Sequence, residues 1–239
     1  MPGLGTIINV LGILLGGLLG LCFGKLLKER HQQTLSRACG VCVLFIGIAG
    51  ALEGILSIRD GSIVSGQSML IVICLSLGAL IGELLNIEKG FERFGNWLKM
   101  KTGNAKDKLF VEGFVTASLT VCIGAMAIVG AIQDGIKKDY SILATKAVLD
   151  LIIIMVMTCS LGKGCLFSAI PVALLQGSVT ALATLLRPVM TAQAQANLSM
   201  IGSILIFCVG INLVWDKRIR VANLLPAVVL AVIATFLPI

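Results

Sequence analysis

The sequence has little charge and almost no histidine. Charged residues make up 13% of the 239 positions, against about 25% in an average soluble domain, and His31 is the single histidine. Hydrophobic residues make up 57% of the chain. A soluble core of this size could not bury so much apolar surface, so the composition excludes a water-soluble enzyme and indicates an integral membrane protein.

The usual motifs of intramembrane catalysis and of ATP-driven pumping are also missing. The chain contains no H-E-x-x-H, no G-x-S-x-G and no G-x-x-x-x-G-K-[ST] sequence. Most of the cysteines lie inside apolar runs, where cysteine acts as a small hydrophobic residue. Cys39 and Cys42 form one C-x-x-C pair, which supplies only two of the ~4 ligands that zinc needs. We therefore expect no enzyme, no disulfide framework, no metal site and no cofactor.

Eight apolar runs approach the ~20 residues needed to cross about 30 Å of hydrocarbon. They cover residues 4–24, 38–58, 63–85, 109–132, 141–161, 165–186, 198–214 and 221–237. The sequence therefore predicts an all-α fold, a polytopic membrane helix bundle with about eight spans. Residues 1–239 would form a single integral membrane domain, with the lipid bilayer as its principal partner.

The basic residues between these runs test the number of spans independently. Alternate loops on one side contain fourteen of them: Lys25, Lys28, Arg30, Arg37, Lys89, Arg93, Lys99, Lys101, Lys106, Lys108, Lys163, Lys217, Arg218 and Arg220. The loops on the other side contain four: Arg59, Lys137, Lys138 and Arg187. Because cytoplasmic loops are rich in Lys and Arg, the first side is predicted to be cytoplasmic and both termini outside. Orientation in a bilayer explains these clusters better than nucleic-acid binding does.

The longest loop, residues 86–108, contains apolar residues at helical spacing. Ile87, Phe91, Phe94 and Leu98 share one face, and Lys89 lies on another. This pattern predicts a short interfacial helix on the cytoplasmic leaflet, acting either as an anchoring connector or as a lipid or partner sensor.

Glycines at a strict spacing of four indicate tight helix packing in the first span. Gly12, Gly16, Gly20 and Gly24 leave one face of bare backbone that another helix can approach closely. The partner helix could belong to the same chain or to a second copy, and the second reading predicts a homodimer or higher homo-oligomer.

An internal repeat is faintly visible. A shift of 162 residues places Gly40 on Gly202 and Phe45 on Phe207. The repeat units would be residues 1–85 and 164–239 around a central helix pair, 109–161. Because the related spans are five apart, they would have opposite orientations, as in inverted-topology transporters.

The fifth span carries the strongest candidate for a functional site. Asp150 lies close to mid-membrane, and Lys146 precedes it by one helical turn on the same face. Charged side chains at this depth are costly unless they are paired or face a water-filled cavity. The pair therefore either binds or couples to a solute or proton, or locks helices together.

Further candidates flank this pair. Gly124, Gly130 and Pro171 are positions where a helix could break, as in the discontinuous helices of secondary transporters, although glycine packing and a proline kink explain them equally well. The polar residues predicted to contribute to a binding site are Asn9, Gln133, Asp134, Ser168 and Gln176. Asn9, like Asn212 and Asn223, could instead only bridge helices by hydrogen bonds.

Five stretches of the chain carry a resemblance to a known family. They are Gly5-Thr6 with Asn9, the run 122–135, Lys146 with Asp150, the run 162–177, and the run 219–227. In these stretches the chain resembles the YdfK/YqgA-like family (domain of unknown function family 554), and the resemblance covers almost the whole sequence. It implies a bacterial plasma (inner) membrane protein of about eight helices, of a family suspected of transport, and names no substrate.

Two functions agree with these observations. The first is a membrane transport protein that moves a small solute or ion by a passive or ion-coupled route past Asp150. The alternative is a non-transporting scaffold or regulatory subunit that acts through helix contacts. A water-accessible cavity that reaches Asp150 would favour the first, and a dry Asp150 against a partner charge would favour the second.

The predicted orientation can be tested by cysteine labelling in spheroplasts, with the native cysteines replaced. A cysteine at Lys138 should react with a membrane-impermeant reagent added outside, and a cysteine at Lys101 should not, because the two loops lie on opposite sides. Equal labelling of both positions from outside would contradict the eight-span topology.

Overall fold

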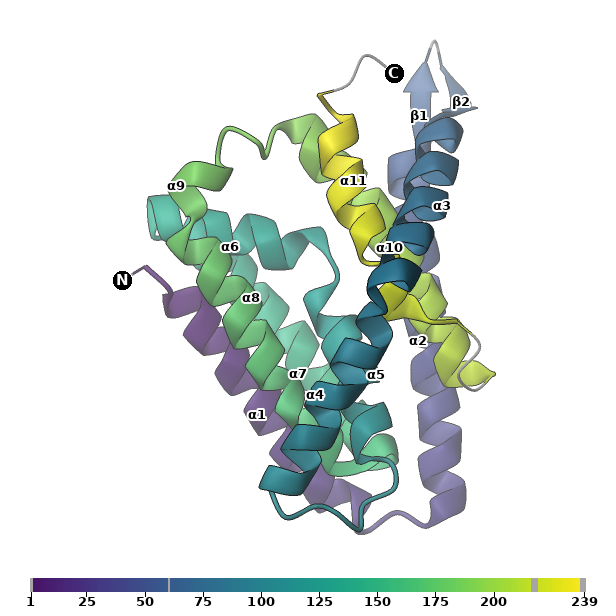
Figure 1. The fold of residues 1–239 in the computed structure, drawn as a ribbon, viewed down its shortest axis with the longest axis vertical. Helices are drawn as coiled ribbons and strands as arrows, with labels where there is room; N and C mark the ends of the chain where they lie inside the picture. Colours follow the sequence, from purple (N-terminus) through teal and green to yellow (C-terminus); the bar gives the residue numbers. More distant parts are fainter. Residues whose placement is uncertain (1, 60, 216–218, 237–239) are drawn as a thin grey trace.

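The computed structural model describes residues 2–59, 61–215 and 219–236, and most of these residues are helical (Figure 1). The helices are α1 (Leu4–Gly24), α2 (Glu29–Ile55), α3 (Ser68–Leu85), α4 (Ile87–Lys101), α5 (Phe110–Cys122), α6 (Ala125–Lys137), α7 (Ser141–Leu161), α8 (Ala169–Ala181), α9 (Ala183–Leu186), α10 (Ala192–Val214) and α11 (Pro226–Ala234), with 3-10 turns η1 (Gly162–Ser168) and η2 (Val221–Leu224). The prediction of an all-α fold is confirmed. Lys217 and Arg218, counted with the cytoplasmic charges, and Leu237, the predicted end of the last span, lie outside the described residues.

Not every predicted span forms one straight membrane-length helix. Within the described residues, five helical stretches are long and apolar enough to cross a membrane, or six if the bent pair α5 and α6 counts as one span. The last apolar stretch, Val221–Ala234, is shorter. The prediction of membrane-spanning helices is thus confirmed, but length and composition alone do not yield eight.

The longest of these stretches, Ser141–Ala181, reverses direction at η1. It has 41 residues, which as a straight helix would be about twice the thickness of the hydrocarbon. Gly24 of α1 lies against Cys159, whereas Gly17 lies against Leu166. The chain therefore descends beside α1 as α7 and returns beside it as α8.

The glycine face of α1 packs against α7 of the same chain. A Cβ atom on Gly12 would lie 2.8 Å from the carbonyl oxygen of Ala147, and one on Gly16 would overlap the carbonyl oxygen of Leu151. Successive glycines of α1 meet successive turns of α7, so the two helices run parallel. The opposite face of α1 is exposed and apolar, as expected for a surface in contact with lipid. Since α7 occupies the glycine face, that face supplies no argument for a homodimer.

Two further pairs of helices approach closely at glycines, but run antiparallel. Gly40 of α2 lies against Leu213 of α10, and Gly54 lies against Met200. Gly78 of α3 similarly meets Ala227 at the start of α11. Bare backbone thus brings together helices that are far apart in the sequence.

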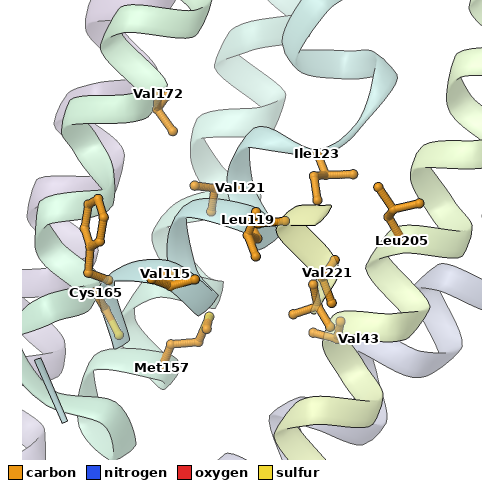
Figure 2. Packing of buried hydrophobic residues seen from close by; sticks show 14 of the residues in the cluster. Val43, Val115, Leu119, Val121, Ile123, Met157, Cys165, Val172, Leu205 and Val221 are labelled. Atoms are coloured by element: carbon orange, nitrogen blue, oxygen red, sulfur yellow. The ribbon is translucent and has the colours of Figure 1, made fainter. Parts of the chain in front are cut away.

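The helices form two groups with α5 between them. Figure 1 shows α1, α6, α7 and α8 on one side and α2, α3, α10 and α11 on the other. Figure 2 shows Val115, Leu119 and Val121 of α5 in the middle of the apolar core, between Val172 of α8 and Leu205 of α10. α5 therefore connects the two groups.

Two local features lie at opposite ends of this bundle. Beyond α2, strands β1 (Leu56–Arg59) and β2 (Ser62–Ser65) form an antiparallel hairpin in which Ile58 pairs with Ile63, and the all-α prediction did not include it. The helix expected within residues 86–108 does form, as α4. Its apolar face covers α5, with Leu98 buried and Phe94 5.7 Å from Phe114 between ring centroids. Its place on the cytoplasmic leaflet stays a prediction.

The contact between α1 and α7 predicts that a large side chain on the glycine face will destabilise the fold. Gly16→Leu should lower the free energy of unfolding by at least about 1–3 kcal/mol, because the backbones must move apart. Gly177→Leu on α8 is the matched control, since nothing lies within 4 Å of a Cβ atom there. Thermal unfolding in mild detergent, followed by Trp fluorescence, measures both, and equal unfolding temperatures would contradict the packing argument.

Candidate functional site

Lys146 and Asp150 form a buried ion pair in the middle of α7. The Lys146 Nζ atom lies 2.7 Å from Oδ1 and 2.6 Å from Oδ2 of Asp150. The two residues are only 7% and 3% exposed. The pairing offsets much of the cost of holding each charge at membrane depth, so removing one partner would strand the other.

Two other helices contribute polar groups beside this pair. Asn9 of α1 is fully buried, and its amide faces the carboxylate of Asp150. Cys122, the last residue of α5, lies within electrostatic range of both charges. The parallel packing of α1 on α7 is what places Asn9 at this depth.

The helical path through α5 and α6 breaks beside the pair. α5 ends at Cys122, α6 begins at Ala125, and the two axes differ by 60°. Gly124 between them has φ +144°, a conformation that is strained for any residue with a side chain. The break leaves carbonyl groups at the end of α5 and N–H groups at the start of α6 without partners in their own helix. Of the predicted breakable positions, Gly124 is the one where a helix is interrupted.

Gln176 of α8 lies near the first turn of α6. The Thr180 hydroxyl donates a hydrogen bond to the carbonyl oxygen of Ala131 (3.2 Å), and Gly135 lies against Ala183, so α6 and α8 run side by side in the same direction. Gln176, one turn before Thr180, is therefore level with Ala127. Its side chain is fully buried and its amide atoms have no partner among the described residues.

Ser168 lies close to the level of Asp150. Gly16 of α1 meets Leu151 and Gly17 meets Leu166, so the residues that follow Leu166 lie near the middle of α7. The Ser168 hydroxyl is buried and has no hydrogen bond within the described chain. We use the name polar centre for Asn9, Lys146, Asp150, Ser168 and Gln176 together with the break at Gly124.

Four predicted site residues do not belong to the polar centre, and Asp134 is described separately below. Gly130 is not a helix break, because α6 continues through it and it packs against Leu143. Pro171 does not kink a span: it lies in the first turn of α8, where a helix needs no N–H donor. Gln133 lines a separate cavity of about 160 Å³ with Arg187 and Gln195.

Asp134 has a capping role at the start of α1. One of its carboxylate oxygens accepts a hydrogen bond from the Gly5 N–H (2.9 Å), which satisfies a donor that the first turn of a helix leaves free. Its other oxygen is buried without a partner among the described residues. Asp134 thus connects α6 to the first turn of α1.

A polar network that the sequence did not predict fixes the end of α3 to η2. The Asn223 amide donates to Glu83 (2.6 Å) and accepts from the Glu88 N–H (2.7 Å), and Glu88 accepts from the Ala222 N–H (3.0 Å). Asn223 was expected to bridge helices, and it does. The role of Glu88 had no sequence signal, because its partners are about 135 residues away.

The largest described cavity, about 480 Å³, lies between α4, α5, α10 and η2. Glu88, Glu92, Lys108 and Glu112 line its polar part, and its apolar part includes Leu119, one turn before Cys122. Neither Lys146 nor Asp150 lines this cavity or any of the four others described for residues 2–59, 61–215 and 219–236. The ion pair is thus closed off from them in this conformation.

Comparison with known proteins places these features in a family. The sequence profile described as "Protein of unknown function (DUF554)" matches residues 4–236. The chain belongs to this family. It is 28% identical to the uncharacterized membrane protein YdfK of Bacillus subtilis, over 97% of this chain and 95% of that protein. It is 30% identical to the uncharacterized protein YqgA of Escherichia coli, over 95% of this chain and 94% of that protein. No solved structure matches.

The capping role of Asp134 predicts different effects for two substitutions. Asp134→Ala should lower the free energy of unfolding by about 1 kcal/mol, because the Gly5 N–H loses its acceptor. Asp134→Asn keeps an oxygen at that position and should have a smaller effect. Thermal unfolding in detergent compares the two, and an equal loss in both would show that the charge of Asp134, rather than its acceptor, is what matters.

Proposed function

We propose that the protein transports a small solute across the bacterial plasma (inner) membrane through the polar centre. The observation that carries this proposal is the set of buried polar atoms near the level of the ion pair that have no partner among the described residues: both amide atoms of Gln176 and the hydroxyl of Ser168. Leaving each such atom unsatisfied costs about 1–3 kcal/mol. A site that binds water or solute during its cycle explains why they are retained. The proposal includes no chemical conversion of the solute.

Eight crossings of the bilayer are part of this proposal. In an eight-span chain α1 and α7 run in one direction, and α8 returns in the other, as the contacts of Gly24 and Gly17 with Cys159 and Leu166 require. α2 and α10, and likewise α3 and α11, must be antiparallel, which agrees with their glycine contacts. α5 with α6 would then form the fourth span, and both termini would lie outside.

The helix pairs also support an inverted repeat. If residues 1–85 and 164–239 are related by a two-fold axis in the membrane plane, α1, α2 and α3 correspond to α8, α10 and α11. Each helix of the first set packs against its counterpart in the opposite direction. Helices that meet their own counterparts lie close to such an axis, and inverted-repeat transporters place their substrate sites at the interface between the repeats.

The break in the fourth span and the large cavity support a route to the polar centre. Discontinuous helices present backbone donors and acceptors at mid-membrane, where an unbroken helix presents none. The cavity beside α4 extends along α5 to Leu119, one turn from the break. In the proposed orientation it opens to the cytoplasm, and the closed pair corresponds to a state in which the solute has no access.

One observation favours a second function, that of a non-transporting scaffold. Lys146 and Asp150 pair with each other, and the described cavities stop short of them. A structural pair that locks α7 in place would look the same. The two functions differ in what happens when both charges are removed together.

The double variant Asp150→Asn with Lys146→Met distinguishes the two functions. Asp150→Asn alone should destabilise the protein by about 3–5 kcal/mol, because Lys146 is left unpaired, and the second substitution should restore stability. In proteoliposomes we expect the wild type to move at least one of protons, potassium, chloride, urea and glycine, and the folded double variant to move it far more slowly.

The control for this experiment is Ser178→Ala, a substitution on the exposed side of α8, which should transport like the wild type. A folded double variant with wild-type flux would remove the pair from the mechanism. A wild type that moves none of the five solutes would favour the scaffold.

A further inference from the structure

We propose that the polar centre binds a small zwitterion, a solute with one ammonium and one carboxylate group and no net charge. This inference rests on the transport function proposed above and names the class of solute. It is derived from the charges, the free hydrogen-bonding groups and the space around the ion pair.

The charge of the site favours a solute without net charge. Lys146 and Asp150 compensate each other at mid-membrane, so the centre is neutral when empty. A lone cation or anion would add a charge that no described group of the polar centre balances, and an uncompensated charge at this depth is strongly disfavoured. A net-neutral solute leaves the balance of charge unchanged.

The ion pair itself distinguishes a zwitterion from an uncharged solute. To reach the pair, a solute must separate Nζ of Lys146 from the two oxygens of Asp150. An uncharged molecule such as urea would leave both charges without a counter-charge. A zwitterion replaces one ion pair with two, because its carboxylate pairs with Lys146 and its ammonium pairs with Asp150.

The remaining groups of the centre suit the two ends of such a solute. Asn9 presents its amide to the carboxylate of Asp150, and Gln176 offers from α8 a donor and an acceptor that have no partner among the described residues. The first turn of α6, level with Gln176, presents N–H groups and the positive end of a helix dipole, which favours a carboxylate. Amide oxygens accept from the ammonium, and amide and backbone N–H groups donate to the carboxylate.

The neighbouring residues limit the size of the solute. Gly12 and Ala147 are in contact where α1 crosses α7, and Gly124 and Ala127 form the start of α6. Ala127 and Ala147 are both buried. None of the described cavities reaches the ion pair, so a solute must open its own space there, and we expect its side chain to be no larger than that of alanine.

Uptake of radiolabelled glycine into proteoliposomes of the full chain tests the inference. We expect uptake above that of empty liposomes, competition by a tenfold excess of unlabelled alanine, and little competition by leucine, acetate or methylammonium. Acetate and methylammonium carry one half of the zwitterion each, so competition by either as strong as that by alanine would overturn the proposal. Competition by leucine as strong as that by alanine would overturn the size limit.

The same experiment separates this inference from the transport function. If potassium, chloride, protons or urea move and glycine does not, the zwitterion proposal is wrong and transport stands. If none of these solutes moves, both are wrong.

Substitutions locate the binding site. Asn9→Ala and Gln176→Ala should each lower glycine uptake roughly tenfold or more, because each removes hydrogen bonds to a charged group, whereas Ser178→Ala should not change it. Glycine should also raise the unfolding temperature of the wild type more than acetate does, a measurement that requires no variant. Wild-type uptake by both folded alanine variants, or the absence of a glycine-specific shift, would overturn the assignment.

Discussion

The close approach of α1 to α7 is the contact on which the polar centre depends. Within a bilayer there is no hydrophobic force between helices, so they associate through close packing and hydrogen bonds. Glycines 12, 16 and 20 allow the backbones to meet, and the parallel register that results places Asn9 beside Asp150. With larger residues at these positions, the helices would separate and the ion pair would lose the neighbour that faces it from α1.

The break between α5 and α6 adds a second element to the same region. An unbroken helix satisfies its own backbone groups and offers nothing polar at mid-membrane. By ending at Cys122 and restarting at Ala125, the chain exposes backbone donors and acceptors close to the only buried charges of α7. The centre therefore combines side chains of α1, α7, η1 and α8 with the backbone of the broken helix pair α5 and α6.

Much of this arrangement could be predicted from the sequence, and the missing parts have physical reasons. The Lys146–Asp150 pair was predictable because residues four apart share a helix face. The partner of the glycine face could not be predicted, because glycine spacing shows that a helix approaches and does not show which one.

The sequence around Gly124 is as apolar and as rich in small residues as the sequence around Gly130. Only the structure shows that the helix is interrupted at Gly124, whereas Gly130 packs against Leu143 inside α6. Pro171 was predicted to break a helix, whereas it lies in the first turn of one, because the 3-10 turn before it leaves no clear pattern in an apolar run. Gln133 was grouped with the site because it adjoins Asp134, yet neighbouring helix positions face different directions.

The distance along the chain between α1 and α7 also affects how the protein is made. Gly12 precedes Ala147 by 135 positions, and at the usual rates of synthesis α7 emerges roughly 7 to 30 s after α1. During that interval the glycine face of α1 is in the bilayer without its final partner. Any other small-residue surface, including that of a second nascent copy, can compete for it. Assembly of this fold therefore requires α1 to find α7 within the membrane. The order in which the spans leave the ribosome determines how long α1 remains without this partner.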